Sequence, residues 1–396
     1  MSNSGPPYAV SQATGLNLNH VHRTQHTAQK TSTVAVPGRN LSMSPSTRFA
    51  HLRPLALTAL GTSVALALGA CDAGSDTSSA GSPTPSASRT PAPKGAISKA
   101  AAQQVVDHFQ AVNNAANATR DAKLLGTVEA GVPYAQDQGV YKQWKTWTAK
   151  KQKTYSSPFA YKNRQYLIPA APATWFAMTA TSSDGDKSRG MFVFDKADGG
   201  PYKMSGAVWL GKKTTLPKIA VDRHGLAESV NPAQQVGALA PNQLRTAYED
   251  LWETGGAQEG KKLASTAETK EAISRYRHYK AHGTGKDDQT GKNIADSWFV
   301  TAEPASSTVY ALRLANGGVL AVAGTAHTQK TVVKPQYPNG YLQAGEAQIA
   351  LGASGSGEIY SINDTYQGQL LAALTPQSAQ VIDSEWEHVG SASTQR

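Results

Sequence analysis

The sequence predicts an α+β fold made of two modules, each with helices followed by an antiparallel sheet. Apolar residues recur at spacings of three and four near residue 97 and again near residue 244, which indicates amphipathic helices. Each helical region precedes short runs rich in Trp, Phe, Val and Tyr, and glycine-containing turns such as SSDGDK, DGG and GKK separate those runs. Short β-prone runs between such turns are typical of antiparallel strands.

An uncharged stretch of 17 residues, Leu55 to Cys71, is the feature from which we predict the location of the protein in the cell. Arg48 and Arg53 precede it, and small residues end it at the one cysteine of the chain. A basic segment, an apolar run and small residues in that order are the pattern of a secretory signal peptide. The run is shorter than the roughly 20 apolar residues that a membrane-spanning helix needs.

The end of this run resembles the lipobox of bacterial lipoproteins, with Leu68, Gly69 and Ala70 before Cys71. The resemblance implies that diacylglycerol is attached to the Cys71 thiol, that the peptide is cut before it, and that the new amino terminus is acylated. It also implies a lipid-anchored protein on the extracytoplasmic face of the cell membrane. The alternative for Cys71 is a free thiol buried in an apolar helix.

Composition divides the chain into five segments. Residues 1–42 are expected to follow from a mis-assigned start codon, with translation beginning at Met43, or to form a disordered leader. Residues 43–70 are expected to be the signal peptide. Residues 71–95, rich in Ser, Pro and Thr, bury too little apolar surface to fold and form a tether. The two modules are predicted over residues 96–230 and 240–391.

Charge and cysteine usage constrain the function only weakly. The net charge is +10, but the first 70 residues hold five basic and no acidic residues, so the chain from Cys71 onward carries +5. A mildly basic protein suits an anionic lipid or wall polymer, but a solvated surface is the default interpretation of this charge. With one cysteine, an intramolecular disulfide is excluded.

The predicted elements follow the helix-then-strand order in both modules. In the first, helices are expected over 97–116, 122–127 and 135–150, then strands over 164–169, 173–182, 189–196, 202–210 and 217–222. In the second, helices are expected over 244–252 and 266–281, then strands over 297–302, 308–314, 319–331, 341–351, 358–371 and 380–389. Ser98 is the expected cap of the first helix.

This element order resembles the NTF2-like and cystatin-like folds, in which a helix packs into the concave face of a curved antiparallel sheet. Together with the lipobox, the Ser/Pro tether and the high alanine content, it is similar to uncharacterised lipoproteins of actinobacteria of the Streptomyces kind. The resemblance implies a fold and a location but no specific activity.

Two histidines are the weak candidates for a metal site. His278 and His282 lie four residues apart on a predicted helix, so their rings share one face. No acidic residue lies between them, and Arg275, Arg277 and Lys280 would repel a dication. A solvated basic helix end is therefore the favoured interpretation, and no metal or other cofactor is predicted.

Carboxylates beside histidines are the weak candidates for acid–base chemistry. One pair is Asp222 with His224, and a second group is Asp383, Glu385 and Glu387 with His388. The three acids of the second group alternate along a predicted strand and share one face, which we expect to face solvent.

Tyrosines and an acid at the mouth of an NTF2-like cone are the alternative catalytic set, namely Tyr310, Tyr360, Tyr366 and Glu346. No GxSxG, P-loop or GxGxxG motif occurs. The seven tryptophans are expected in the core, and one that is exposed could stack on a sugar.

The sequence thus predicts a membrane-anchored lipoprotein with a non-catalytic binding or scaffold role in the cell envelope. The membrane is contacted through the lipid on Cys71, and the expected partner is an envelope protein, a wall polymer or a small apolar ligand; no nucleic acid is expected. The alternatives are an NTF2-like pocket enzyme, an isomerase or dehydratase that transfers protons, and a solute-binding lipoprotein of a transporter.

Overall fold

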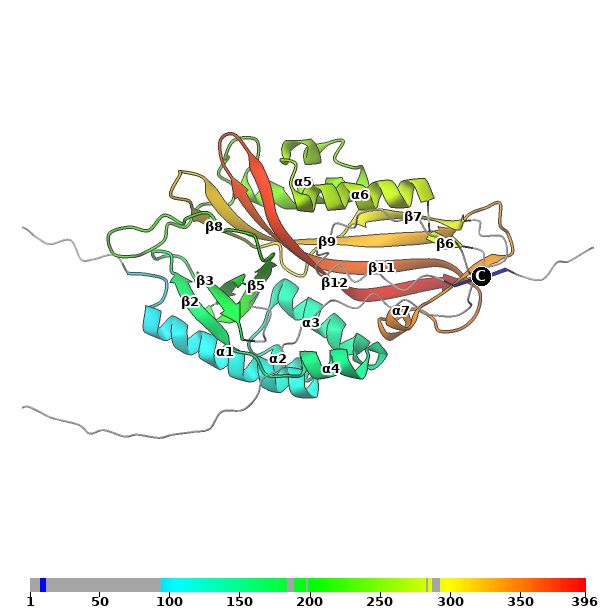
Figure 1. The fold of residues 1–396 in the computed structure, drawn as a ribbon, viewed down its shortest axis with the longest axis horizontal. Helices are drawn as coiled ribbons and strands as arrows, with labels where there is room; N and C mark the ends of the chain where they lie inside the picture. Colours follow the sequence, from blue (N-terminus) through cyan, green and yellow to red (C-terminus); the bar gives the residue numbers. More distant parts are fainter. Residues whose placement is uncertain (1–7, 12–93, 184–188, 197–198, 283, 287–292) are drawn as a thin grey trace, which may run out of the picture.

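The computed structural model describes residues 8–11, 94–183, 189–196, 199–282, 284–286 and 293–396. It is mixed α+β, as predicted, and its elements form four layers: helices, a four-stranded sheet, an eight-stranded sheet and further helices (Figure 1). None of the helices in the described ranges is long and apolar enough to cross a membrane.

The first helical layer precedes the small sheet in sequence. It contains α1 (Lys99–Thr119), α2 (Ala122–Leu125), α3 (Gly131–Gln143), the 3-10 turn η1 (Trp144–Thr146) and α4 (Ala149–Tyr155). The Ser98 hydroxyl accepts a hydrogen bond from the amide of Ala101, so the predicted cap of α1 is confirmed. The helix expected over 135–150 is instead divided at Trp144, where η1 turns the chain into α4.

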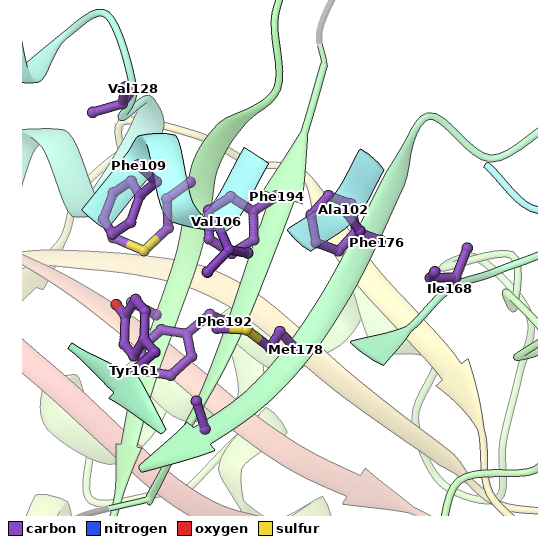
Figure 2. Close-up of a cluster of buried hydrophobic side chains, with 13 residues drawn as sticks. Ala102, Val106, Phe109, Val128, Tyr161, Ile168, Phe176, Met178, Phe192 and Phe194 are labelled. Carbon is purple, nitrogen blue, oxygen red and sulfur yellow. The ribbon is translucent and has the colours of Figure 1, made fainter. Parts of the chain in front are cut away.

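The small sheet is an antiparallel meander in sequence order. Its strands are β2 (Tyr161–Leu167), β3 (Trp175–Ser182), β4 (Arg189–Asp195) and β5 (Lys203–Leu210). Alternation along β3 and β4 points Phe176, Met178, Phe192 and Phe194 toward Phe109 of α1 (Figure 2). The rings of Phe109 and Phe194 meet edge to face, with centroids 5.6 Å apart.

The second helical layer and the large sheet come from the rest of the chain. The helical elements are η3 (Pro241–Gln243), α5 (Leu244–Glu253), η4 (Glu259–Lys262), α6 (Ala267–His282) and the short α7 (Glu346–Ala350). The strands are β6 (Thr284–Lys286), β7 (Asn293–Thr301), β8 (Val309–Arg313), β9 (Val319–Val333), β10 (Gly340–Gln343), β11 (Ile359–Leu374) and β12 (Ala379–Gln395).

Three long strands, β9, β11 and β12, organise the large sheet. β11 pairs antiparallel with β12 along one edge and with β9 along the other. The free edge of β9 is shared, because β8 pairs with its first half and β7 with its second half. Helices α5 and α6 lie over this sheet on the side away from the small sheet (Figure 1).

The two sheets pack face to face. One buried cluster joins Ala177, Met191, Val193 and Val208 of the small sheet to residues of β8, β9 and β11 in the large one, among them Leu312, Leu320, Val322 and Leu371. The segment after β5 also bridges both sheets, with Ala227 paired to Pro169 and Ser229 paired to Leu312. The predicted modules therefore share a hydrophobic core.

Two of the predicted strands are wrong. Residues 341–351 contain the short strand β10 followed by the helix α7, and residues 217–222 form only isolated bridges at Ile219 and Val221. A further short strand, β1 (Tyr8–Ser11), pairs in parallel with β10. It lies among the residues that cleavage before Cys71 would remove.

Candidate functional site

A buried glutamate–histidine pair lies between α5 and the large sheet. The Nδ1 atom of His327 on β9 is 3.2 Å from a carboxylate oxygen of Glu249, and the Thr325 hydroxyl donates to the other oxygen. Glu249 is 1 % exposed and His327 is fully buried. Removing one partner of such a pair would leave a buried charge or polar group uncompensated, so the pair fixes α5 on the sheet.

Aromatic rings fill the space around this pair. The His327 ring has its centroid 4.3 Å from that of Trp386, 4.7 Å from Trp252 and 4.9 Å from Phe299. Next to it, Tyr366 stacks on His388, whose Nε2 lies 3.2 Å from an oxygen of Asp364. The region under α5 is thus filled by aromatic rings packed around the Glu249–His327 pair.

A second polar cluster lies between α3, α4 and β12. The prediction that Asp383, Glu385 and Glu387 share one face is confirmed, but the prediction that this face meets solvent is wrong. The amides of Gly211 and Trp209 donate to Asp383 and Glu385 at 2.8 and 2.7 Å, and the Gln143 side chain lies 3.3 Å from Glu387. These carboxylates face the edge of β5 and the helix α3.

The carboxylates of this cluster have raised pKa values. Burial, opposed by the hydrogen bond from the Trp209 amide, raises the pKa of Glu385 to about 8. Burial also raises the pKa of Glu387 to about 7, with Lys151 opposing it, and that of Asp137 on α3 to about 6. Glu129, which accepts from Asn113 at 3.0 Å, has its pKa raised well above the usual range by burial and by the charge of Asp137.

The other sequence candidates do not assemble into a site. Asp222 is exposed and accepts hydrogen bonds from the amides of His224 and Leu226, which holds its pKa below the usual value and closes a turn. His278 is exposed on α6, and the side chain of His282 lies outside the described residues. In the part of the chain that the structure describes, no group of three or more His, Cys, Asp or Glu side chains could hold a metal.

The tyrosine and glutamate set is dispersed over the large sheet. The Tyr310 hydroxyl donates to Asp195 at 3.0 Å between the two sheets, whereas Tyr366 lies under α6. Tyr360 packs beside β10, and Glu346 is exposed at the start of α7. These residues cannot act on one substrate. Cys71 and the lipobox residues Leu68, Gly69 and Ala70 lie outside the described residues.

Among the described residues, no helix or strand covers one face of one half of the large sheet. The register places three rows of residues on the face opposite α6, and every one of them is exposed or half-buried. We call this the open sheet face; its rows are Asp296, Val332, Ser361 and Thr394; Trp298, Lys330, Asn363 and Ala392; and Val300, Thr328, Thr365 and Gly390.

Trp298 is the aromatic residue of this face. It is 43 % exposed, while its neighbours Ser297 and Phe299 are buried on the α6 side. Trp298 also borders a cavity of about 210 Å³ between α6 and β7, lined in addition by Tyr276, Tyr279, Lys280, Ser297 and Phe299. The cross-strand neighbour of Trp298 is Lys330, and short neutral side chains lie further along the face. An exposed indole in this setting can stack on a flat ligand.

Sequence reasoning missed Glu249, His327 and Trp298, although the strand periodicity contains a signal for two of them. In β9 the odd-numbered residues Val319 and Ala321 are buried, and the same alternation places His327 on that face. In β7 it places Trp298 opposite the buried Phe299. Glu249 has no such signal, since acidic residues on helices are usually exposed.

Residues 93–385 match the model of a family described as Domain of unknown function (DUF8094). An uncharacterized lipoprotein of Streptomyces coelicolor is 33 % identical over 288 residues, which cover 71 % of this chain and 78 % of the relative. The match extends over both sheets and both helical layers. The chain therefore belongs to the DUF8094 family and is related to an uncharacterised lipoprotein.

Proposed function

We propose that the protein is an exported lipoprotein, held at the outer face of the cytoplasmic membrane by lipid on Cys71, which binds a glycan of the cell wall without catalysing a reaction. The lipobox and the lipoprotein relative support the anchor. The observation that carries the binding role is the exposure of Trp298 on the open sheet face.

The shape and chemistry of the open sheet face suit an extended sugar polymer. The face is a continuous surface of β7, β9, β11 and β12 rather than a closed cavity. Trp298 offers an apolar platform, and Asn363, Thr328 and Thr365 offer neutral donors and acceptors around it. Sugar rings combine an apolar face with hydroxyl edges, so both parts of the surface have a matching partner.

The core under α5 and α6 favours this proposal over an NTF2-like pocket enzyme. An acid–base enzyme needs its carboxylate within hydrogen-bond reach of a substrate. Glu249 is enclosed by Trp252 and by its partners His327 and Thr325. The helices-then-strands order also differs from the two alternating α/β lobes of a solute-binding lipoprotein.

Substitution of Trp298 tests the binding role. Trp298→Ala should lower the affinity for purified, solubilised wall glycan at least about tenfold, because truncating a central tryptophan of an interface costs about 2 kcal/mol or more. Ile349→Ala is the matched control, since Ile349 is 42 % exposed but lies on α7. Binding of equal strength by both variants would contradict the proposal.

Substitution of Cys71 tests the anchor separately. Cys71→Ala should leave the precursor uncleaved or release the protein from the membrane fraction, because the lipidated thiol is the expected attachment point. The measurement is labelling with a fatty-acid analogue together with fractionation. A fully processed, labelled membrane protein with Ala at position 71 would rule out this anchor.

A further inference from the structure

The net positive charge of the chain from Cys71 onward is concentrated in the segment 138–157. This segment contains the end of α3, the turn η1 and the helix α4. Five of the 38 basic residues precede Cys71, and all 28 acidic residues follow it. Segment 138–157 has five lysines and no acidic residue, so the remaining basic and acidic residues from Cys71 onward are equal in number. A positive charge this concentrated is an electrostatic feature of one surface.

Four of these lysines project into solvent around an aromatic cluster. Lys142, Lys145, Lys150 and Lys153 are exposed. We call them, with the half-buried Trp144 and Trp147, the lysine-rich surface. The ring of Tyr155 on α4 lies 6.0 Å from Trp144 and 5.6 Å from Trp147, so α4 folds back on the end of α3 and the lysines are held on one compact projection.

The fifth lysine and the nearby acids face inward. Lys151 lies over the Trp147 ring at 3.3 Å, and its charge opposes the rise in the pKa of Glu387. Asp137 accepts a hydrogen bond from the Tyr155 hydroxyl at 3.0 Å. Asp137 and Glu387 therefore interact with Tyr155 and Lys151 on the inner side of this projection.

We propose that the lysine-rich surface docks on the anionic phospholipid headgroups of the membrane to which the chain is tethered. Lysines attract anionic lipid, and tryptophan is enriched at the level of the headgroups. Phosphodiesters of a wall polymer would also attract these lysines. The tether favours the membrane, because it keeps the folded part close to the lipid headgroups. This inference rests on the proposed anchor at Cys71, without which no membrane would be near.

The length of the tether is consistent with this docking. Residues 72–94, 23 in number, can reach at most about 80 Å if fully extended. They join the folded part at the start of α1, whose 21 residues are about 31 Å long. The ring of Trp144 lies 4.7 Å from the guanidinium of Arg120, just after the end of α1. A connection of that reach is long enough for the lysine-rich surface to contact the membrane that holds Cys71.

Vesicle sedimentation tests the proposal with the mature chain, residues 71–396, carrying Cys71→Ser so that no lipid is attached. All five clusters of buried hydrophobic residues lie between Ala96 and Trp386, so this chain keeps its core. We expect it to bind vesicles of phosphatidylglycerol and phosphatidylcholine at low salt, to bind pure phosphatidylcholine poorly, and to be released as salt screens the charges.

The lysine substitutions give the decisive comparison. The variant with Lys145→Gln, Lys150→Gln and Lys153→Gln should bind the anionic vesicles about a hundredfold more weakly, at about fivefold for each lysine. A control with Lys213→Gln, Lys261→Gln and Lys270→Gln removes as many exposed charges elsewhere and should bind as the unsubstituted chain does.

Three outcomes would overturn the docking proposal: equal loss in both variants, equal binding to neutral vesicles, or displacement by soluble polyglycerol phosphate at charge concentrations well below those of the lipid. The last would assign the surface to a wall polymer. Because the protein in this assay carries no lipid, its failure to bind vesicles would leave the Cys71 anchor standing. Release of the Cys71→Ala protein in cells would likewise leave the vesicle result unaffected.

Discussion

The buried carboxylates near β12 are held where their neutral form is favoured. Glu385 accepts a hydrogen bond from the Trp209 amide, which lowers its pKa. Burial, together with the charges of Asp383, Asp137 and Glu387, outweighs this bond and raises the pKa of Glu385 to about 8. A folded-state pKa above the ordinary value of about 4.3 means that the folded protein binds the proton more tightly than the unfolded chain. The associated stability is complete below about pH 4 and is lost as the pH rises toward 8.

We therefore expect the melting temperature to fall between pH 5.5 and pH 8.5. Glu385→Gln should flatten this fall and raise stability at pH 8.5, because the amide oxygen can still accept from Trp209 and no charge is buried. Thermal unfolding followed by circular dichroism at a series of pH values measures the effect. Glu346→Gln, at an exposed site on α7, should leave the pH profile unchanged. Parallel profiles for Glu385→Gln and the parent would refute the assignment.

The alternation of Asp383, Glu385 and Glu387 was enough to predict that they share a face, but not what covers it. Asp383 and Glu385 accept hydrogen bonds from Gly211 and Trp209, at the end of β5, which lie more than 170 positions earlier in the chain. Local periodicity contains no information on which distant strand edge meets that face. The same limit explains why the Glu249–His327 pair, 78 residues apart, was not predicted.

At the scale of elements, the edge of β5 is closed by side chains of the large sheet instead of by a fifth strand. The amides of Ala207, Trp209 and Gly211 donate to Gln369, Glu385 and Asp383 at 2.7, 2.7 and 2.8 Å. An unpaired strand edge is a template for aggregation unless it is covered. The acceptors from β11 and β12 thus position the two sheets and protect this edge.

Replacing the first acceptor tests this role. Gln369, 1 % exposed, also donates to Gln136 on α3 at 2.9 Å. Gln369→Leu should lower the free energy of unfolding by about 1–3 kcal/mol, because the Ala207 amide is left buried without an acceptor. Urea denaturation measures the change, and amide exchange at Ala207 should accelerate. Gln165→Leu on exposed β2 is the control and should stay within about 0.5 kcal/mol of the parent.

Most elements were predictable because their periodicity is regular. The α1 pattern continues over several turns, and β3 and β4 are runs of β-prone residues bounded by turns; all three were predicted with nearly correct ends. The errors are short elements. β10 and α7 together occupy residues 340–350, where a few apolar residues fit a strand and a helix equally well, so packing against neighbours decides.

At the scale of the whole molecule, the order of helices and strands was predictable, and the packing of one sheet on the other was not. The two central strands of the small sheet, β3 and β4, are apolar on both faces, as Phe192 and Val193 of β4 illustrate, and such strands are buried on both sides. The sequence shows that both faces of these strands must be buried, but it does not show that the large sheet buries one of them. The NTF2-like or cystatin-like assignment stays a prediction.

The shared core has a consequence for how the molecule unfolds. Without residues 240–391, the small sheet would expose Met191, Val193, Val208 and Leu210, which now pack on the large sheet. An exposed apolar sheet face favours association, so the isolated segment 96–230 should aggregate or lack cooperative unfolding. The mature chain should instead unfold in one transition, because neither sheet keeps its core when the other is lost. Calorimetry and near-ultraviolet circular dichroism measure both. Two resolved transitions, or a monomeric segment 96–230 with its own sharp melting, would show that the predicted modules fold independently and that the sheet–sheet cluster is a docking interface between them.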